Sequence, residues 1–149
     1  MIITRKDLMI KIRKMFPNLI DGFPNPSNIA MPDDNYWLMT KAEVETILRD
    51  TWIEKYKYVI DGFDCEDYSL IFHAFVIQER YKKMKKAGQT GWLPFAIGQC
   101  WGTKFEGKVR SHAINLAITS DAGIIFIEPQ KDRVFTANPG DNDIYFLRM

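Results

Sequence analysis

Two helices are predicted in the first part of the chain by apolar residues that recur every three or four positions. The first covers residues 6–16 and would present one apolar face. A stretch rich in Pro, Gly, Asn and Asp follows it and predicts irregular structure. The second helix opens at Thr40, where Thr40 and Glu43 form a capping-box pattern, and it should run to about Trp52.

A third and longer helix is predicted over residues 65–86, after a break in the chain at Asp61 and Gly62. Asp64 would cap its N-terminus and Gly88 would end it. Its first half is apolar nearly all round. This pattern predicts a helix that is buried on every side at the centre of the fold.

Beyond Gly91 the apolar residues follow the period of β-strands. Strands are expected at residues 92–101, 113–119, 124–127, 133–136 and 144–147. The segment SDAG at residues 120–123 predicts a hairpin turn between two of them. Helices followed by antiparallel strands indicate an α+β fold, formed by a single domain that spans residues 1–149.

Composition and charge exclude several classes of protein. Of the 149 residues, 46% are hydrophobic, and the formal net charge is +1 with both signs mixed along the chain. We therefore expect a folded domain that binds no nucleic acid. A membrane span of about 18 apolar residues and a signal peptide are both absent, which predicts no membrane contact and a cytoplasmic location. The two cysteines, Cys65 and Cys100, indicate free thiols in a reducing compartment.

Cys65 is the first candidate for chemistry, because it begins the long helix. Unpaired backbone N–H groups and the positive end of the helix dipole would favour its thiolate. The carboxylates of Asp64, Glu66 and Asp67 would oppose this and raise the pKa of the thiol. A protonated histidine or a bound metal ion would offset them. The alternative is a buried and unreactive cysteine.

Position separates the two histidines. His73 lies eight residues after Cys65, about 12 Å along the same helix, so we expect it in the core or on the helix face. His112 begins a strand, and the turn at 120–123 would bring Glu128 of the next strand within reach of its ring. A glutamate that follows a buried apolar run needs a partner. The alternative for Glu128 is a solvated charge at the end of a strand.

A zinc site is the competing arrangement, and it would combine both cysteines with both histidines. The chain has no CxxC or HxxxH spacing, and His73 is too far from Cys65 to share an ion with it. Zinc is therefore disfavoured. Cys100 lies in the strand-like run FAIGQCWG, and we expect it to be a buried core residue without a role in chemistry.

Three segments, in order, resemble the papain-like and transglutaminase-like superfamily of cysteine proteases. GFDCEDYS at residues 62–69 resembles its nucleophile segment, and SHAINL at residues 111–116 resembles its histidine strand. IEPQ at residues 127–130 resembles its acid motif, with Glu128 in place of the usual Asp. The likeness is greatest to the papain-like C-terminal domain of mushroom chimerolectins and its bacterial and phage relatives. It covers residues 61–135.

The resemblance implies a papain-like/transglutaminase-like fold and a catalytic triad of Cys65, His112 and Glu128. The implied function is a cysteine peptidase or a related thiol acyl-transfer enzyme acting on a protein or peptide substrate. Hydrolysis, transglutamination and deamidation are all open. The alternative is a catalytically silent papain-like interaction module, such as an inhibitor encoded by a virus or phage.

The resemblance also implies a dependence on calcium. Asp64 and Asp67 would share one face of the helix and supply oxygen ligands to that ion. No other cofactor is expected. The lectin half of the chimerolectins, a β-trefoil, has no counterpart in this sequence, so the resemblance does not imply sugar binding.

Overall fold

Three α-helices and eight strands make up the described part of the chain. The structure is a computed structural model, and it describes residues 1–19, 28–88 and 93–149. The helices are α1 (Arg5–Met15), α2 (Lys41–Thr51) and α3 (Cys65–Ala87), with short 3-10 helices at Ile53–Lys55 and Pro129–Lys131. The strands are β1 (Ile2–Thr4), β2 (Ile29–Ala30), β3 (Asn35–Trp37), β4 (Ile97–Phe105), β5 (Lys108–Thr119), β6 (Gly123–Glu128), β7 (Arg133–Thr136) and β8 (Asp143–Arg148).

The predicted capping residues at the helix ends are confirmed. At α2 the Thr40 hydroxyl accepts the Glu43 N–H, while the Glu43 carboxylate accepts the Thr40 N–H. At α3 Asp64 and Asp67 form the same reciprocal pair, and Gly88 ends the helix with a φ of 62°. These bonds satisfy N–H groups that have no partner inside the helix. The first residue of α3 is therefore Cys65.

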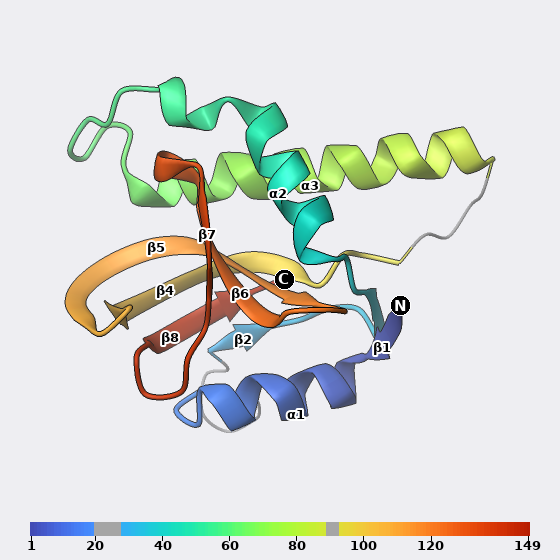
Figure 1. The fold of residues 1–149 in the computed structure, drawn as a ribbon, viewed down its shortest axis with the longest axis horizontal. Coiled ribbons are helices and arrows are strands. Elements are labelled where there is room, and N and C mark those ends of the chain that lie inside the picture. The colour runs from blue at the N-terminus through green and yellow to red at the C-terminus, as the bar shows by residue number, and fades with distance from the viewer. Residues whose placement is uncertain (20–27, 89–92) are drawn as a thin grey trace.

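A six-stranded sheet with the order β2-β8-β4-β5-β6-β7 runs through the middle of the molecule (Figure 1). Its neighbouring strands are antiparallel, except for β2 and β8, which pair in parallel. β5 and β6 form the predicted hairpin, where Gly123 pairs with Thr119 and has a φ of 72°. Glycine adopts this left-handed conformation without strain. The hairpin sets the strand of His112 beside the strand of Glu128.

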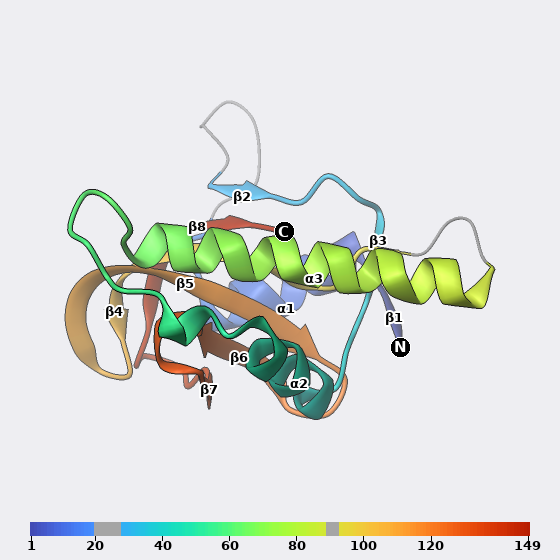
Figure 2. The same ribbon diagram turned by 90° about the horizontal axis from the view of Figure 1, so that it is seen from above.

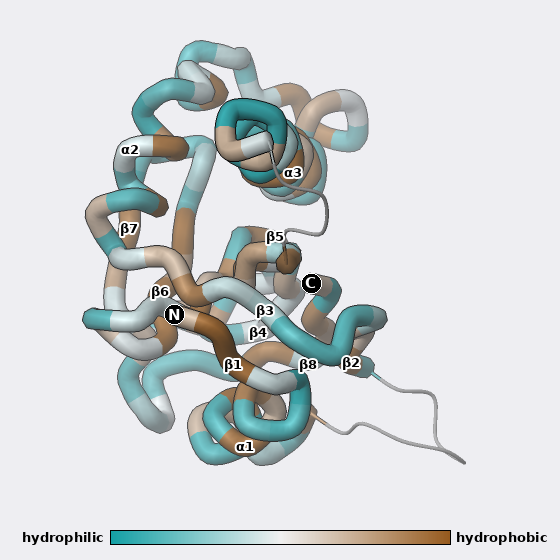
Figure 3. Tube along the Cα trace, turned by 90° about the vertical axis from the view of Figure 1, so that its right-hand side faces the viewer, coloured by the Kyte–Doolittle hydropathy of each residue, from teal (hydrophilic) through white to brown (hydrophobic). Residues whose placement is uncertain are grey.

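Helices cover both faces of this sheet. α2 and α3 lie over one face and α1 lies under the other (Figures 1 and 3). Side chains of β5 point alternately to the two faces, so Leu116 and Ile118 join the core beneath α1, and Ala117 joins the core beneath α3. The view from above shows α3 running along the length of the sheet (Figure 2).

α3 is not the centrally buried helix that its apolar first half predicts. Phe72 and Val76 are buried against the sheet, whereas Leu70 and Ile77 are 54% and 48% exposed. The helix lies on the outside of the sheet, so only one stripe of its surface is covered. Together with the parallel pairing of β2 and β8, this departs from the predicted arrangement of a central helix on an antiparallel sheet.

α3 has 23 residues, and its second half carries several lysines. Neither it nor another helix in the described ranges combines the length and the apolar character that a membrane span requires.

Some predictions fall outside the described residues: the irregular structure expected at Pro24 and Pro26, and the start of a strand at Trp92.

Candidate functional site

The structure brings together the three residues that the sequence proposes as a triad. Cys65 begins α3, His112 lies on β5, and Glu128 is the last residue of β6. His112 Nε2 lies 2.6 Å from Glu128 Oε2. The N–H of Ala113 donates to Cys65 Sγ over 3.4 Å, so the sulfur lies against the strand next to His112. The expected approach of Sγ to the imidazole ring, within about 4 Å, stays a prediction.

Glu128 is the most buried member of this cluster, with a side chain that is 1% exposed. A carboxylate at such a position needs charged or hydrogen-bonding partners. His112 is one of them, and Arg110 supplies a second, with Nη2 at 3.7 Å from Oε2. Because Nε2 faces Glu128, the other ring nitrogen of His112, Nδ1, is the one available to a different partner.

The Cys65 thiol is held in its neutral form. Burial raises its pKa above the ordinary value, and the negative charges of Asp64 and Glu66 raise it further. The N–H groups of Ala113 and of Cys65 itself act in the opposite direction. The helix-start activation expected from the sequence is therefore outweighed, and the thiol is protonated at neutral pH.

Asp64 and Asp67 serve the backbone of α3. Asp64 Oδ1 accepts the Glu66 N–H over 3.2 Å, and Asp67 Oδ2 accepts the Asp64 N–H over 3.0 Å. Calcium takes six to eight oxygen ligands, and these two carboxylates supply only a part of such a set. Within the described ranges, no group of three or more His, Cys, Asp or Glu side chains is placed to hold a metal ion. Calcium binding stays a prediction.

Cys100 is completely buried in the core, as predicted. Burial raises the pKa of its thiol far above the ordinary value. The competing zinc arrangement of both cysteines and both histidines is not assembled among the residues that the structure describes.

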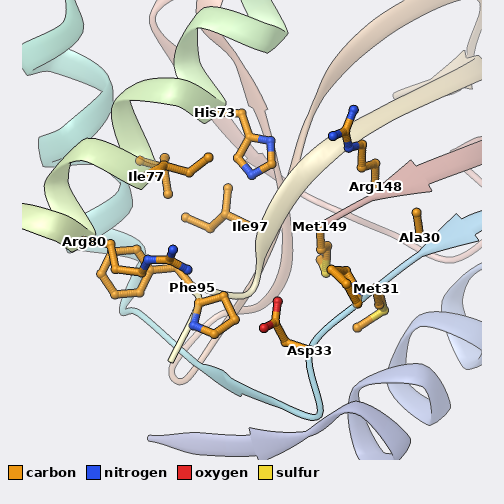
Figure 4. Close-up of a pocket in the computed structure, with 13 residues that line it drawn as sticks. Ala30, Met31, Asp33, His73, Ile77, Arg80, Phe95, Ile97, Arg148 and Met149 are labelled. Carbon is orange, nitrogen blue, oxygen red and sulfur yellow. The ribbon is translucent and has the colours of Figure 1, made fainter. Parts of the chain in front are cut away.

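A pocket on the same side of the sheet contains the other histidine. Its volume is about 480 Å³, and it lies between α3, β4 and the ends of β2 and β8 (Figure 4). Apolar and polar side chains share its lining. The apolar ones include Met31, Val76, Ile77, Phe95, Ile97 and Met149, and the polar ones are Asp33, His73, Arg80 and Arg148.

The His73 side chain lines this pocket, although the sequence predicts only a core or helix-face residue. Burial lowers its pKa, and the nearby positive charges of Arg148 and Arg80 lower it further. A hydrogen bond with the Gln99 side chain acts in the opposite direction. One signal in the sequence indicates this side of the pocket: His73, Ile77 and Arg80 have the spacing of residues on a single helix face.

Similarity to known proteins extends over most of the chain. The model of the agglutinin C-terminal family matches residues 36–134. The chain belongs to the agglutinin C-terminal family. A comparison with curated proteins finds no match.

Two solved structures share the fold of this chain. The PSL1a-E64 complex aligns with a TM-score of 0.71 at 20% identity, over 99% of this chain and 51% of that chain. The Polyporus squamosus lectin bound to the human-type influenza-binding epitope Neu5Aca2-6Galb1-4GlcNAc aligns with a TM-score of 0.70 at 20% identity, over 99% of this chain and 49% of that chain. This agglutinin C-terminal chain therefore spans about half the length of each.

These findings correct the assignment to the papain-like and transglutaminase-like superfamily. The matched family is the agglutinin C-terminal family, and the shared fold is that of lectin chains, which replaces the predicted papain-like fold. The predicted cysteine peptidase or acyl-transfer enzyme, its protein substrate and the papain-like inhibitor module lose their support with that assignment.

Proposed function

We propose that this chain is a carbohydrate-binding domain and that its glycan lies in the pocket between α3, β4 and β8. The observation that carries the proposal is the mixed lining of this pocket. Sugars combine apolar C–H faces with hydroxyl groups, so they need apolar walls together with a few hydrogen-bonding groups. Ile77 and Ile97 supply apolar surface, and His73 and Arg80 supply polar groups, within one concave site.

The size of the pocket supports this proposal as well. A volume of about 480 Å³ falls inside the range of roughly 300–1,000 Å³ that is typical of small-ligand sites. The exposure of Ile77 fits the same idea, because this apolar side chain is 48% exposed and lines the pocket. Membership of the agglutinin C-terminal family adds to the support, as does the glycan bound to the Polyporus squamosus lectin.

The Polyporus squamosus lectin chain is about twice as long as this chain, so sugar binding has to be tested on this chain by itself. Calorimetry provides that test. Two ligands are titrated separately. One is the trisaccharide Neu5Aca2-6Galb1-4GlcNAc, and the other is the disaccharide that remains when its Neu5Ac residue is removed. We expect at least one of them to bind. Ile77→Trp should fill the pocket and abolish binding, whereas Leu70→Trp, at a similarly exposed site on α3 outside the pocket lining, should not. Failure of both sugars to bind the unaltered chain would refute the proposal.

A second candidate function belongs to Cys65, because this thiol lies beside the His112–Glu128 pair. We propose that the Cys65 sulfur attacks an electrophilic carbon of a ligand, and that the bond from this carbon to its leaving atom breaks. Nδ1 of His112 accepts the thiol proton and passes it to the leaving atom, while Glu128 holds the imidazole ring in place. E64 is a suitable probe, because PSL1a was solved in complex with it.

Intact-mass measurement after incubation with E64 tests this second candidate. We expect one added mass on the unaltered chain, no addition on Cys65→Ala, and an unchanged addition on Cys100→Ala. Because burial raises the pKa of Cys65, the reaction should become faster as the pH rises. A chain whose mass does not change, or an addition that persists in Cys65→Ala, would exclude the thiol site.

A further inference from the structure

α1 concentrates positive charge on a chain whose formal charges nearly cancel overall. The net charge of the whole chain is +1. The 11 residues of α1 contain one acid, Asp7, and several exposed basic residues: Arg5, Lys6, Lys11, Arg13 and Lys14. Leu8, Met9 and Ile12 are buried in the core, so the basic residues occupy the outer side of the helix.

Two carboxylates lie close to this helix, and both have local partners. Asp7 Oδ2 accepts the Thr4 hydroxyl over 2.8 Å at the start of α1. Asp34 Oδ1 lies 3.8 Å from Arg5 Nη2. Among the described residues, Lys6 and Lys14 have no ion-pair partner, so their charges remain available to an external anion.

An apolar side chain lies in the middle of the basic residues. Ile10 is 58% exposed. Lys6 precedes it by one helical turn, and Arg13 and Lys14 follow it by one turn, so all four share one side of α1. A shallow hollow of about 350 Å³ on this helix is lined by α1 alone, including Lys6, Ile10 and Arg13. Small-ligand sites enclose most of the ligand, whereas a site formed by one helix suits contact with an extended surface.

We propose that this basic face of α1 (Lys6, Ile10, Arg13 and Lys14) binds the surface of a membrane that contains anionic phospholipids. The charged groups would contact lipid phosphates, and Ile10 would enter the boundary between headgroups and acyl chains. A nucleic acid would also match the positive charges, but its phosphate backbone offers no apolar region to Ile10. The combination of charge with an exposed aliphatic side chain therefore favours lipid.

This contact is separate from the features considered so far. α1 lies under the face of the sheet opposite to α3 (Figures 1 and 3), so the basic face is distant from the pocket proposed for glycans. The sequence-based expectation of no membrane contact rests on the absence of a span and of a signal peptide. Binding to a membrane surface requires neither of them.

Flotation with two kinds of vesicle tests the proposal on the unaltered chain. One kind is phosphatidylcholine alone, and the other is phosphatidylcholine mixed with phosphatidylserine. Neither carries a glycan, so the pocket does not contribute. We expect binding only to the vesicles with phosphatidylserine, and added salt should weaken it by screening the exposed charges. Binding to neither kind, or to both kinds equally, would contradict the proposal.

Two variants separate the contribution of charge from that of apolar contact. Each Lys or Arg near an anionic membrane strengthens binding about fivefold. Lys6→Gln, Arg13→Gln and Lys14→Gln combined should therefore weaken vesicle binding about a hundredfold. Ile10→Gln keeps a good helix former at an exposed position, and it should weaken vesicle binding about tenfold.

The matched control removes the same amount of charge from other parts of the surface. Lys57, Lys85 and Lys86 are exposed residues outside α1, and replacing all three by Gln should leave vesicle binding nearly unchanged. An equal loss in this control, or binding that survives the triple change on α1, would overturn the proposal.

The apolar contact distinguishes lipid from other polyanions. If Ile10→Gln binds the vesicles as tightly as the unaltered chain, or if the chain binds double-stranded DNA and not the vesicles, the lipid assignment is wrong. Far-UV circular dichroism establishes that each variant is folded.

Discussion

The two histidines of this chain differ in the charges that surround them. His112 Nε2 lies 2.6 Å from the buried carboxylate of Glu128, which fixes the orientation of its ring. His73 instead faces the positive charges of Arg80 and Arg148. The two histidines therefore lie in different surroundings, His112 beside Cys65 and His73 in the pocket.

The first residue-scale prediction concerns His73 and pH. Its pKa is below the ordinary value of 6.5 in the folded protein, so the unfolded chain takes up the proton more readily. The unfolding free energy should therefore fall as the pH drops through the ordinary value, and rise again as the pH increases. Urea denaturation at about pH 7 and about pH 5 measures this fall in unfolding free energy, which should be smaller for His73→Gln than for the unaltered chain. An identical fall in both proteins would contradict this prediction.

The second residue-scale prediction concerns Glu128. Glu128→Gln removes the negative charge next to His112 and Arg110, and it should lower the unfolding free energy by about 1–3 kcal/mol. Glu45→Gln is the control, because its partly exposed carboxylate pairs with Lys41 at the protein surface. That change should cost less than about 0.5 kcal/mol. Equal losses in the two variants would mean that Glu128 is not stabilised by its buried partners.

At the scale of elements, local signals in the sequence predict the helix ends well. Thr40 with Glu43, and Asp64 with Gly88, act within a few residues of their own position, so the sequence alone places them. The burial of α3 depends on which other elements cover it. Its apolar first half cannot show that Ile77 remains exposed at a pocket, because the residues across that pocket come from distant segments.

Close packing of β4 against β8 yields a prediction at this scale. A Cβ atom added at Gly98 would collide with the backbone carbonyl of Arg148. Gly98→Ala should therefore separate the two strands and cost about 1–3 kcal/mol of unfolding free energy. At Gly62 the nearest atom is a side-chain carbon of Val59 at 3.2 Å, which can move, so Gly62→Ala should cost less. Thermal denaturation compares the two, and a larger loss for Gly62→Ala would contradict the packing.

The first turn of α3 carries the prediction of calcium binding. If Asp64 and Asp67 bind the ion, calcium should raise the melting temperature, because a ligand that binds only the folded state stabilises it. Asp64→Asn retains a good N-cap residue but loses the charge, so it should abolish that rise. Equal melting temperatures in calcium and in a chelator would rule out this site.

At the scale of the whole molecule, long-range pairing determines where the pocket forms. The parallel pair of β2 and β8 joins Ala30 to Arg148, which are far apart in the sequence. β8 also pairs with β4, where Arg148 lies opposite Gln99, and the end of β8 thereby brings Arg148 near His73. Periodicity within the sequence predicts each strand singly. It contains no signal for a two-residue parallel contact, and the pocket is therefore absent from the sequence-based prediction.

The hairpin of β5 and β6 shows the opposite case. Its turn is local, so the sequence predicts that Glu128 comes within reach of His112, and the structure has these two residues in contact. The resemblance to cysteine proteases assigns an enzymatic function to this cluster, and the family match corrects that function. The sequence therefore predicts the local geometry of the cluster more reliably than its function.

Amide NMR during titration with the sialylated trisaccharide tests carbohydrate binding by this pocket most directly. The proposal predicts that the largest shift changes occur at His73, Ile77 and Arg80 on α3 and at Arg148 on β8, and that they saturate with added sugar. Shift changes confined to the surroundings of Cys65 and His112, or no changes at any sugar concentration, would contradict it.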